Sequence, residues 1–288
     1  HSMPSIAVVI PVYNGALTIA KSIKSLENQT FKDWVAIIVN DGSNDNTKEI
    51  IEALDNKKYI KIHLERNRGR GFARQTALNK IRELKIPYMC MLDADDWYFN
   101  DKLEYQFTFM EKNKGFTLLS NSILVEDDAN ISLIKPFKNE QSFTYHNYNN
   151  FIQLPHASSI IRVNDIEGIN YNIVLKYSED KDFLRRILLS KKYYFDPKIA
   201  YCYNKEFSFS FLKYKKSLLC DNQSFLNLPV SWFSKLKFLS KNYFKILVVK
   251  ILIVLNKVDV YFSKVNDKIS SDELQLYNIQ KQLMSHEN

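Results

Sequence analysis

The sequence predicts an α/β fold with a mostly parallel central sheet, because short apolar runs and helical patterns alternate in its first third. Residues 6–10, 34–39 and 59–64 are mainly apolar, and each run is followed by a polar loop and a helical pattern. Such runs are typical of strands that are buried on both faces. Strands and helices in alternation place successive strands side by side in a parallel sheet.

The helices of this first third are predicted from apolar side chains that recur at helical spacing. Three such patterns cover residues 16–28, 48–54 and 72–84. Residues 44–47 supply side chains that commonly cap a helix, directly before the second pattern. A fourth buried strand is expected over residues 86–92.

The second half of the chain predicts a less regular order. Strands are expected over residues 117–125 and 160–162, with a solvated hairpin turn at 126–130 after the first. Residues 143–152 predict a short helix rich in aromatic side chains. Ser178 is a suitable residue to cap a further helix, because its hydroxyl can accept a hydrogen bond from the first turn.

The composition is that of a globular protein with a substantial core. The chain has 288 residues, of which 45% are hydrophobic and 14% aromatic, and this excludes a disordered chain. Its three cysteines, Cys90, Cys202 and Cys220, are widely spaced and form no metal-binding pattern. We therefore expect a reduced, cytosolic setting.

Three carboxylates crowd into four positions directly after the fourth apolar run, at Asp93, Asp95 and Asp96. Ionised carboxylates this close repel one another unless a cation joins them. Oxygen ligands suit Mg²⁺ or Mn²⁺, and ligands of α/β sheets bind at the carboxyl ends of the strands. On these residues alone, a solvated acidic turn is an equally good interpretation.

Two familiar nucleotide motifs are absent. Residues 69–71 contain only a fragment of a dinucleotide-binding fingerprint, and they follow the third strand rather than the first. No P-loop is present.

Four motifs in order resemble those of the family-two glycosyltransferases. They are Pro-Val-Tyr-Asn at 11–14, Asn-Asp-Gly-Ser-Asn-Asp at 40–45, Asn-Arg-Gly at 67–69 with Ala73 and Arg74 behind it, and Leu-Asp-Ala-Asp-Asp at 92–96. That family has the GT-A fold, a nucleotide-binding α/β sandwich, and transfers sugars from nucleotide donors with inversion. The resemblance covers residues from about 5 to 210.

The resemblance implies a donor site for a UDP-sugar and a divalent metal, Mn²⁺ or Mg²⁺. Pro11 and Tyr13 would lie against the uracil ring, and the flat face and phenol of a tyrosine suit this contact. Asp41 would accept the uracil N3 proton, and Arg74 would contact the base or the diphosphate. The implied donor-binding set is Pro11, Val12, Tyr13, Asn14, Asp41, Arg74, Asp93 and Ala94, and the implied metal ligands are Asp95, Asp93 and Asp96.

The sequence departs from the family pattern at two positions near this site. Asn40 replaces a residue that is frequently acidic, and Gln75 stands where the family usually has Asn. We expect neither position to be indispensable.

Glu179 and Asp180 resemble the Glu-Asp motif that opens the family's catalytic helix. The resemblance makes Asp180 the base that deprotonates the acceptor hydroxyl, with Glu179 beside it. Acidic residues in a first helical turn are also common without catalysis, because they favour the positive end of the helix dipole. His156 either faces the substrates or is a hydrogen-bonded structural histidine.

Residues 201–210 correspond to a late family motif that often reads Tyr-Arg, then His, then Ser-x-Ser. Tyr201 and the serines are present, whereas the arginine and the histidine are not. Any metal or phosphate ligand that the family supplies there is in doubt.

The net charge of +8 belongs to the C-terminal part of the chain. Residues 211–265 contain ten lysines and two acidic residues, so the rest of the chain is balanced. A basic surface confined to one segment predicts a local anionic partner.

Residues 232–265 predict an amphipathic helix within this basic segment. Its apolar run is interrupted by Lys250 and is too short to span a bilayer. Lysines beside an apolar face fit an anionic membrane surface rather than a nucleic acid. Packing on the catalytic domain or in a homodimer is the alternative. The apolar face is expected to comprise Tyr243, Leu247, Ile251, Val254, Val258, Tyr261 and Val265.

We expect a GT-A domain over residues 3–215, with a nucleotide-binding half at 3–97 and an acceptor half at 98–215. A helical, basic extension would cover 216–288. The implied enzyme transfers a hexosyl or N-acetylhexosaminyl group to a glycan or lipid-linked acceptor. It would work at the cytoplasmic face of the cell membrane, in the synthesis of lipopolysaccharide, capsule or another surface glycan.

Two other functions stay open. A sugar nucleotidyltransferase would need a glycine-rich loop with Lys or Arg after the first strand, and residues 11–15 lack it. A catalytically silent, membrane-associated scaffold would not need Asp93, Asp95 and Asp180 together.

Overall fold

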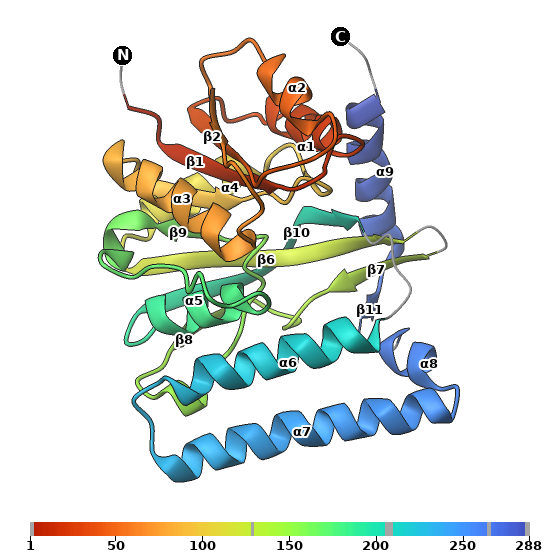
Figure 1. The fold of residues 1–288 in the computed structure, drawn as a ribbon. Helices are drawn as coiled ribbons and strands as arrows, with labels where there is room; N and C mark the ends of the chain where they lie inside the picture. The colour runs from red at the N-terminus through yellow and green to blue at the C-terminus, as the bar shows by residue number, and fades with distance from the viewer. Residues whose placement is uncertain (1–2, 128–129, 205–209, 264–265, 286–288) are drawn as a thin grey trace.

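One mixed β-sheet runs through the protein, with helices on both faces (Figure 1). The computed structural model describes residues 3–127, 130–204, 210–263 and 266–285. The main path through the sheet has the strand order β11-β7-β6-β9-β4-β1-β2-β3, and β10 pairs with β5, β6 and β8. The strands are β1 (Ile6–Val12), β2 (Trp34–Asn40), β3 (Tyr59–His63), β4 (Tyr88–Met91), β5 (Trp97–Tyr98), β6 (Phe116–Asp127), β7 (Asn130–Ile134), β8 (Gln141–Thr144), β9 (Ile160–Arg162), β10 (Lys192–Asn204) and β11 (Asp267–Lys268).

The first four strands form the parallel part of the sheet. β1 pairs in parallel with β2 and β4, and β2 pairs in parallel with β3. β9 is antiparallel to both β4 and β6, and thereby joins this part to the second half. The predicted alternation of strands and helices is confirmed, and the carboxyl ends of β1, β2 and β4 meet at one edge.

Alternate side chains of β1 enter two separate cores, as the period of a strand requires. Ala7 and Val9 pack towards the face that α3 and α5 cover, whereas Ile6, Val8 and Ile10 pack towards α1 and α4. The helices of this part are α1 (Ile19–Glu27), α2 (Thr47–Glu52), α3 (Arg70–Glu83), α4 (Lys102–Lys112) and α5 (Glu179–Ile187).

Four helices follow the last long strand: α6 (Phe211–Leu226), α7 (Trp232–Val254), α8 (Val258–Ser263) and α9 (Ser271–Ser285). α6 and α7 run beside each other below the sheet, and α9 rises along its edge (Figure 1). β11 pairs with β7, and Tyr277 of α9 is buried against Trp97. The predicted domain boundary at 215/216 falls inside α6, and the division into domains stays a prediction.

The predicted helix over residues 143–152 is wrong. Residues 141–144 form β8, which pairs with β10, and only the short 3₁₀ helix η1 (Tyr148–Asn150) follows. The Phe143 ring stacks on Tyr193 of β10 at a centroid distance of 5.3 Å. Cross-strand aromatic packing of this kind outweighs local helical spacing.

The predicted helix over residues 232–265 is interrupted. α7 ends at Val254, Asn256 takes a left-handed conformation with φ of 53°, and α8 begins at Val258. Val265, which was expected on its apolar face, lies outside the described residues. Within the described ranges, none of the helices combines the length and apolar character needed to cross a bilayer.

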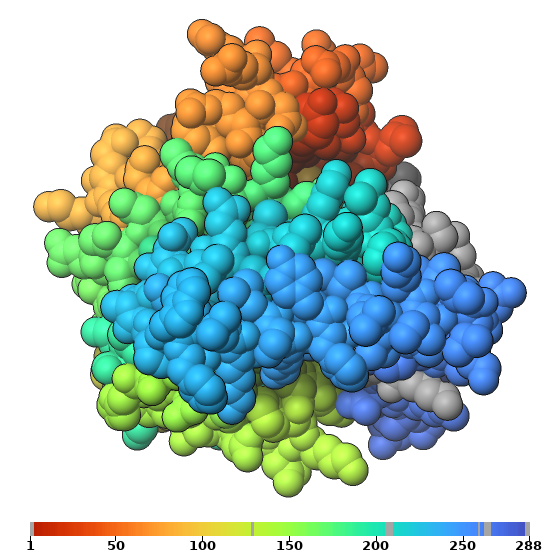
Figure 2. Space-filling model, turned by 60° about the horizontal axis from the view of Figure 1, so that its bottom comes forward, coloured from red at the N-terminus to blue at the C-terminus, as the bar shows by residue number. Residues whose placement is uncertain are grey.

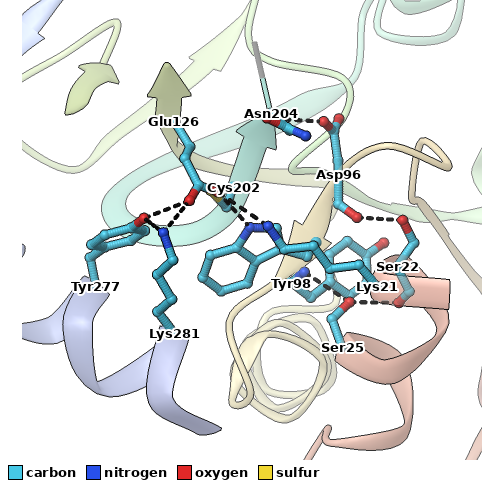
Figure 3. Close-up of polar contacts among 11 residues, drawn as sticks. Lys21, Ser22, Ser25, Asp96, Tyr98, Glu126, Cys202, Asn204, Tyr277 and Lys281 are labelled. Atoms are coloured by element: carbon cyan, nitrogen blue, oxygen red, sulfur yellow. Dashed lines mark hydrogen bonds and ion pairs between the residues drawn. The ribbon is translucent and has the colours of Figure 1, made fainter. Parts of the chain in front are cut away.

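The hairpin predicted at residues 126–130 is present, but its first acid, Glu126, is only 16% exposed. β6 ends at Asp127 and β7 begins at Asn130, and residues 128–129 lie outside the described ranges. Glu126 accepts hydrogen bonds from Tyr277 at 2.7 Å and Lys281 at 2.6 Å, and it pairs with Lys21 at 3.3 Å (Figure 3). Glu126 therefore ties α9 and α1 to the sheet.

Candidate functional site

The loops after β1 and β2 are joined at the carboxyl edge of the sheet. The backbone N–H of Asn14 donates to Ser43 Oγ at 2.9 Å, and Asn44 N donates to Asn14 Oδ1 at 2.8 Å. Val12 is buried beneath this pair of loops, while 46% of the Tyr13 surface is exposed. The Tyr13 ring is thus available to a flat ligand at this edge.

Asp41 lies at the end of β2 and organises a third loop. Its two carboxylate oxygens accept the N–H groups of Arg68 at 2.7 Å and Gly69 at 2.8 Å. Burial raises the pKa of Asp41, although these two amides oppose the rise. Gly42 beside it has φ of +68°, and a Cβ atom there would lie 2.3 Å from the carbonyl carbon of Arg66. Only glycine permits this approach of the two loops.

Arg74 is the residue that joins the two predicted halves of the site. It projects from α3, and its side chain is only 3% exposed. Nη1 donates to Glu179 Oε1 at 2.8 Å, and Nη2 donates to Asp93 Oδ1 at 3.1 Å. Burial alone would lower the pKa of Arg74, but Asp93 and Glu179 raise it above its ordinary value. One permanent cation thus joins the end of β4 to the start of α5.

Glu179 and Asp180 open α5 in different environments. Glu179 is buried and held by Arg74, and burial raises its pKa. Asp180 is partly exposed, and no ion pair within 4.0 Å involves it among the described residues. Burial would raise the pKa of Asp180, but the permanent charge of Arg74 lowers it overall. Asp180 is therefore an ionised carboxylate with an accessible face at neutral pH, which is what a general base requires.

Ser178 is the N-cap residue of α5, as predicted, but its hydroxyl makes no capping hydrogen bond to the first turn. Its hydroxyl is within 2.8 Å of Ser217 Oγ and donates to the Ser217 carbonyl at 3.1 Å, both in α6. The φ angle of Ser178 is 57°, a conformation that non-glycine residues rarely adopt. Strained backbone of this kind persists only where surrounding contacts hold it, and it is frequent at active sites.

His156 lies behind the same cluster, buried to 4% exposure. Its Nε2 is 3.0 Å from Tyr171 Oη, and its Nδ1 has no hydrogen-bond partner among the described residues. Burial, helped by Arg74, lowers the pKa of His156 to about 3, so the ring is neutral. The structural interpretation accounts for the Nε2 contact, but not for Nδ1.

The three acidic residues after β4 diverge. Asp95 is exposed and Asp93 is partly exposed, whereas Asp96 is only 1% exposed. The Asp96 carboxylate accepts the Tyr201 hydroxyl. It also accepts the Asn204 N–H at 2.9 Å (Figure 3). Burial, with Asp93 and Asp95 nearby, raises the pKa of Asp96 to about 9.

The positions of the Asp93, Asp95 and Asp96 carboxylates determine which kind of metal site they can form. The described residues contain no group of three His, Cys, Asp or Glu side chains that could hold a metal ion. Asp93 and Asp95 nevertheless offer carboxylate oxygens at the edge of the site, which suits Mg²⁺ or Mn²⁺ bound jointly with substrate phosphates. Asp96, by contrast, binds inward to β10. The site therefore fits a metal shared with a donor and not one enclosed by protein.

The sequence profile described as glycosyl transferase family 2 matches residues 7–169, more than half of the chain. The chain belongs to this family. An uncharacterised glycosyltransferase of Methanocaldococcus jannaschii is 34% identical to it over 200 residues, which cover 67% of each chain. A GalNAc(5)-diNAcBac-PP-undecaprenol β-1,3-glucosyltransferase of Campylobacter jejuni is 31% identical over 132 residues, which cover 45% of this glycosyltransferase and 41% of the relative.

Two solved structures share the fold of this glycosyltransferase. Staphylococcus aureus TarS 1–349 in complex with UDP-GlcNAc superposes with a TM-score of 0.63 at 21% identity, over 83% of this chain and 71% of the 1–349 chain. A mannosyltransferase of Pyrobaculum calidifontis in complex with GDP-Man and Mn²⁺ has a TM-score of 0.58 at 11% identity, over 98% of this chain and 86% of the other. The predicted GT-A fold class is confirmed.

The glycosyltransferase contains site residues that sequence reasoning missed. Arg70 lies one helical turn before Arg74, with its Nε 4.0 Å from Glu179 Oε1. Its spacing of four residues from Arg74 on a helix was a usable signal. Tyr201 was noted, but its contact with Asp96 was not foreseeable, since 105 residues separate them. Residues 205–209 of the late motif lie outside the described ranges.

The two departures from the family pattern have structural partners. Asn40 Oδ1 accepts the Ser43 N–H at 3.1 Å. Gln75 Oε1 accepts the Tyr171 N–H at 2.8 Å. Both side chains shape loops beside the site.

Proposed function

We propose that this glycosyltransferase moves a sugar from a UDP-sugar to an acceptor hydroxyl with inversion, and that it requires a divalent metal. The observation that carries the proposal is the Arg74 cluster. It gathers the Asp93 end of the donor motif and the Glu179-Asp180 pair around one buried cation. The edge of the sheet proposed to bind the donor therefore lies beside Asp180, the candidate base.

In the proposed reaction, the acceptor oxygen attacks the anomeric carbon from the face opposite the leaving group. The bond from that carbon to the phosphate oxygen breaks, UDP leaves, and the hydroxyl proton passes to Asp180. Single displacement of this kind inverts the anomeric configuration. General-base assistance is typically worth about 10²–10⁴ in rate.

The donor site is proposed from the edge residues. Tyr13 would stack on the uracil ring, flanked by Pro11, Val12 and Asn14. Asp41 would accept the uracil N3 proton with the lone pairs that Arg68 and Gly69 leave available. Arg74 and the backbone at Ala94 complete the set.

Asp93 and Asp95 would hold the metal together with the donor diphosphate. When bound, a divalent cation stabilises the negative charge of the departing nucleotide. We leave Asp96 out of the proposed ligand set, because its carboxylate binds Tyr201 and Asn204. Glu179 is proposed as a positioning residue, because Arg74 occupies its carboxylate.

The proposed acceptor is a glycan or a lipid-linked glycan. The Campylobacter jejuni relative is named for an undecaprenol-linked acceptor, and a Bacillus subtilis relative, 33% identical over 146 residues, carries a provisional name in teichuronic acid biosynthesis. We therefore propose a role in surface-glycan synthesis at the cytoplasmic face of the cell membrane, with a hexose or N-acetylhexosamine as the transferred sugar.

A panel of nucleotide sugars tests this function. UDP release or thermal stabilisation should occur with a UDP-sugar, and should require Mn²⁺ or Mg²⁺. A response only to nucleoside triphosphates with sugar phosphates would instead identify a nucleotidyltransferase. No response to any nucleotide would favour a silent scaffold.

A further inference from the structure

The outward face of α7 is apolar along its whole length. Beyond its first residue, Trp232, seven large apolar or aromatic side chains of this helix are between 49% and 79% exposed: Phe233, Leu236, Tyr243, Phe244, Leu247, Ile251 and Val254. With about 100° between successive residues of a helix, all of them fall on one side. We name these seven residues the α7 outer face.

The opposite side of α7 is fixed against α6. Asn242 and Val249 are buried there, and Asn242 Nδ2 donates to Asn222 Oδ1 at 2.7 Å. The rings of Phe238 and Phe225 stack with a centroid distance of 3.9 Å. A buried amide pair and a stacked ring pair specify which side of α7 faces inward. The exposure of the outer face is therefore a property of the fold.

Charge flanks the α7 outer face on both sides. The helix contains five lysines and no acidic residue. Lys237 and Lys241 lie along one flank and Lys250 along the other, and all three are exposed. Figure 2 shows α7 stretched across one surface of the molecule with α6 beside it. Apolar side chains flanked by lysines are complementary to a surface that is anionic outside and apolar within.

We propose that α7 lies flat in the interface of an anionic lipid bilayer, with the α7 outer face in the acyl region and the lysines among the headgroups. The helix has 23 residues, so about 34 Å of its length can lie along the bilayer. Lys237, Lys241 and Lys250 interrupt its hydrophobicity at intervals that suit lying in the interface.

A second copy of the chain is a less suitable occupant. In a twofold dimer the same patch meets itself, so the lysine flanks of two copies would come together. α7 has no acidic side chain to oppose them. The acid of the neighbouring helix, Asp221, is buried and paired with Arg185 at 2.9 Å. Lipid phosphates supply the missing negative charge.

The bilayer surface is coupled to the catalytic helix through α6. Besides the pair of Asp221 with Arg185 of α5, Ser224 Oγ donates to Asp182 Oδ1 at 2.6 Å, and Ser217 contacts Ser178 at 2.8 Å. α6 thus holds the residue before Glu179-Asp180 and the body of α5. This part of the inference rests on the proposed function: the contacts of α6 would set the orientation of Asp180 towards an acceptor anchored in the membrane.

Vesicle sedimentation with the full chain tests the docking surface. The parent should sediment with vesicles that contain phosphatidylglycerol and should remain in solution with phosphatidylcholine alone. Leu247→Glu with Ile251→Glu should abolish sedimentation, whereas Leu283→Glu, at an exposed apolar position of α9, should not. Lys237→Gln with Lys241→Gln should lower the partition coefficient about thirtyfold, the contribution of two interfacial lysines. Lys57→Gln with Lys112→Gln is the matched control at exposed lysines elsewhere.

Three results would overturn the proposal. The parent could ignore anionic vesicles, it could bind both vesicle types equally, or it could form a dimer without lipid that the Leu247/Ile251 variant loses. UDP binding by each variant, measured in solution, separates this question from the proposed function. A variant that no longer sediments with vesicles but binds UDP as tightly as the parent has lost only membrane docking. Loss of UDP binding together with docking would show that α7 is needed by the catalytic core, and would contradict a separate membrane surface.

Discussion

Replacing Arg74 by methionine is expected to destabilise the protein in a strongly pH-dependent way. Methionine fills much of the same space but leaves Glu179, 5% exposed, without its 2.8 Å partner, and only the exposed Arg70 remains, at 4.0 Å. Removing one member of a buried ion pair costs about 3–5 kcal/mol. The Asp93 carboxylate, 22% exposed, adds less because water reaches it. We expect a loss of about 3–5 kcal/mol in the free energy of unfolding at pH 7.

The sign of the pH dependence follows from Glu179. Burial already raises its pKa in the parent, where Arg74 opposes the rise. Without Arg74 the pKa of Glu179 rises further above the unfolded value of about 4.3. A carboxyl with a raised pKa in the folded state costs nothing below the unfolded pKa, and its cost grows as pH increases above that value. The deficit of the variant should therefore be smaller at pH 5 than at pH 7.

Urea denaturation at pH 5 and pH 7 measures this effect. Adding Glu179→Gln to Arg74→Met should restore part of the lost stability at pH 7, because the uncompensated charge is gone. Arg82→Met is the matched control, since this arginine of α3 bonds Asn170 and two carbonyls and makes no ion pair among the described residues. Its cost should not change between the two pH values. An equal deficit for Arg74→Met at both pH values, without rescue by Glu179→Gln, would refute the reasoning.

Three further changes have separate expected outcomes. Asp180→Asn should leave UDP affinity unchanged while transfer falls by about two to four orders of magnitude; steady-state kinetics at near-parental rates would return Asp180 to a role in the first helical turn. Asp95→Ala should remove the metal dependence of donor binding, and calorimetry with UDP that still shows an Mn²⁺ effect would contradict this. Burial would raise the pKa of Glu126, but hydrogen bonds from Lys281 and Tyr277 outweigh it and lower the pKa to about 2. This stabilisation is present above pH 4.5 or so and is lost as pH falls towards 2, so Glu126→Gln should cost about 1–2 kcal/mol at pH 7 and progressively less in acid. Unfolding curves that differ equally at pH 7 and pH 3 would exclude it.

Several candidate site residues could be predicted because they lie in short sequence motifs. Asp93 and Asp95 follow a strand whose apolar run is local, so their place at the carboxyl edge of the sheet could be expected. Asp41 and Arg74 were singled out by the family resemblance, and Arg74 lies in the second turn of α3. Asp96 was not separable from Asp93 and Asp95 by this reasoning. Its inward turn depends on Tyr201, which lies in a distant strand.

The sequence alone determined the alternation of strands and helices and the order of the motifs, because burial imposes periods of 2 and 3.6 residues on neighbouring positions. Tertiary structure alone decided the pairing of Arg74 with Glu179, which are 105 residues apart. It also decided the direction of the Ser178 hydroxyl and which side of α7 faces outward. A residue pattern reports how apolar each face of an element is, but the partner that covers a face comes from distant parts of the chain. For α7, packing of Asn242 and Phe238 against α6 selected the inner side and left the α7 outer face exposed.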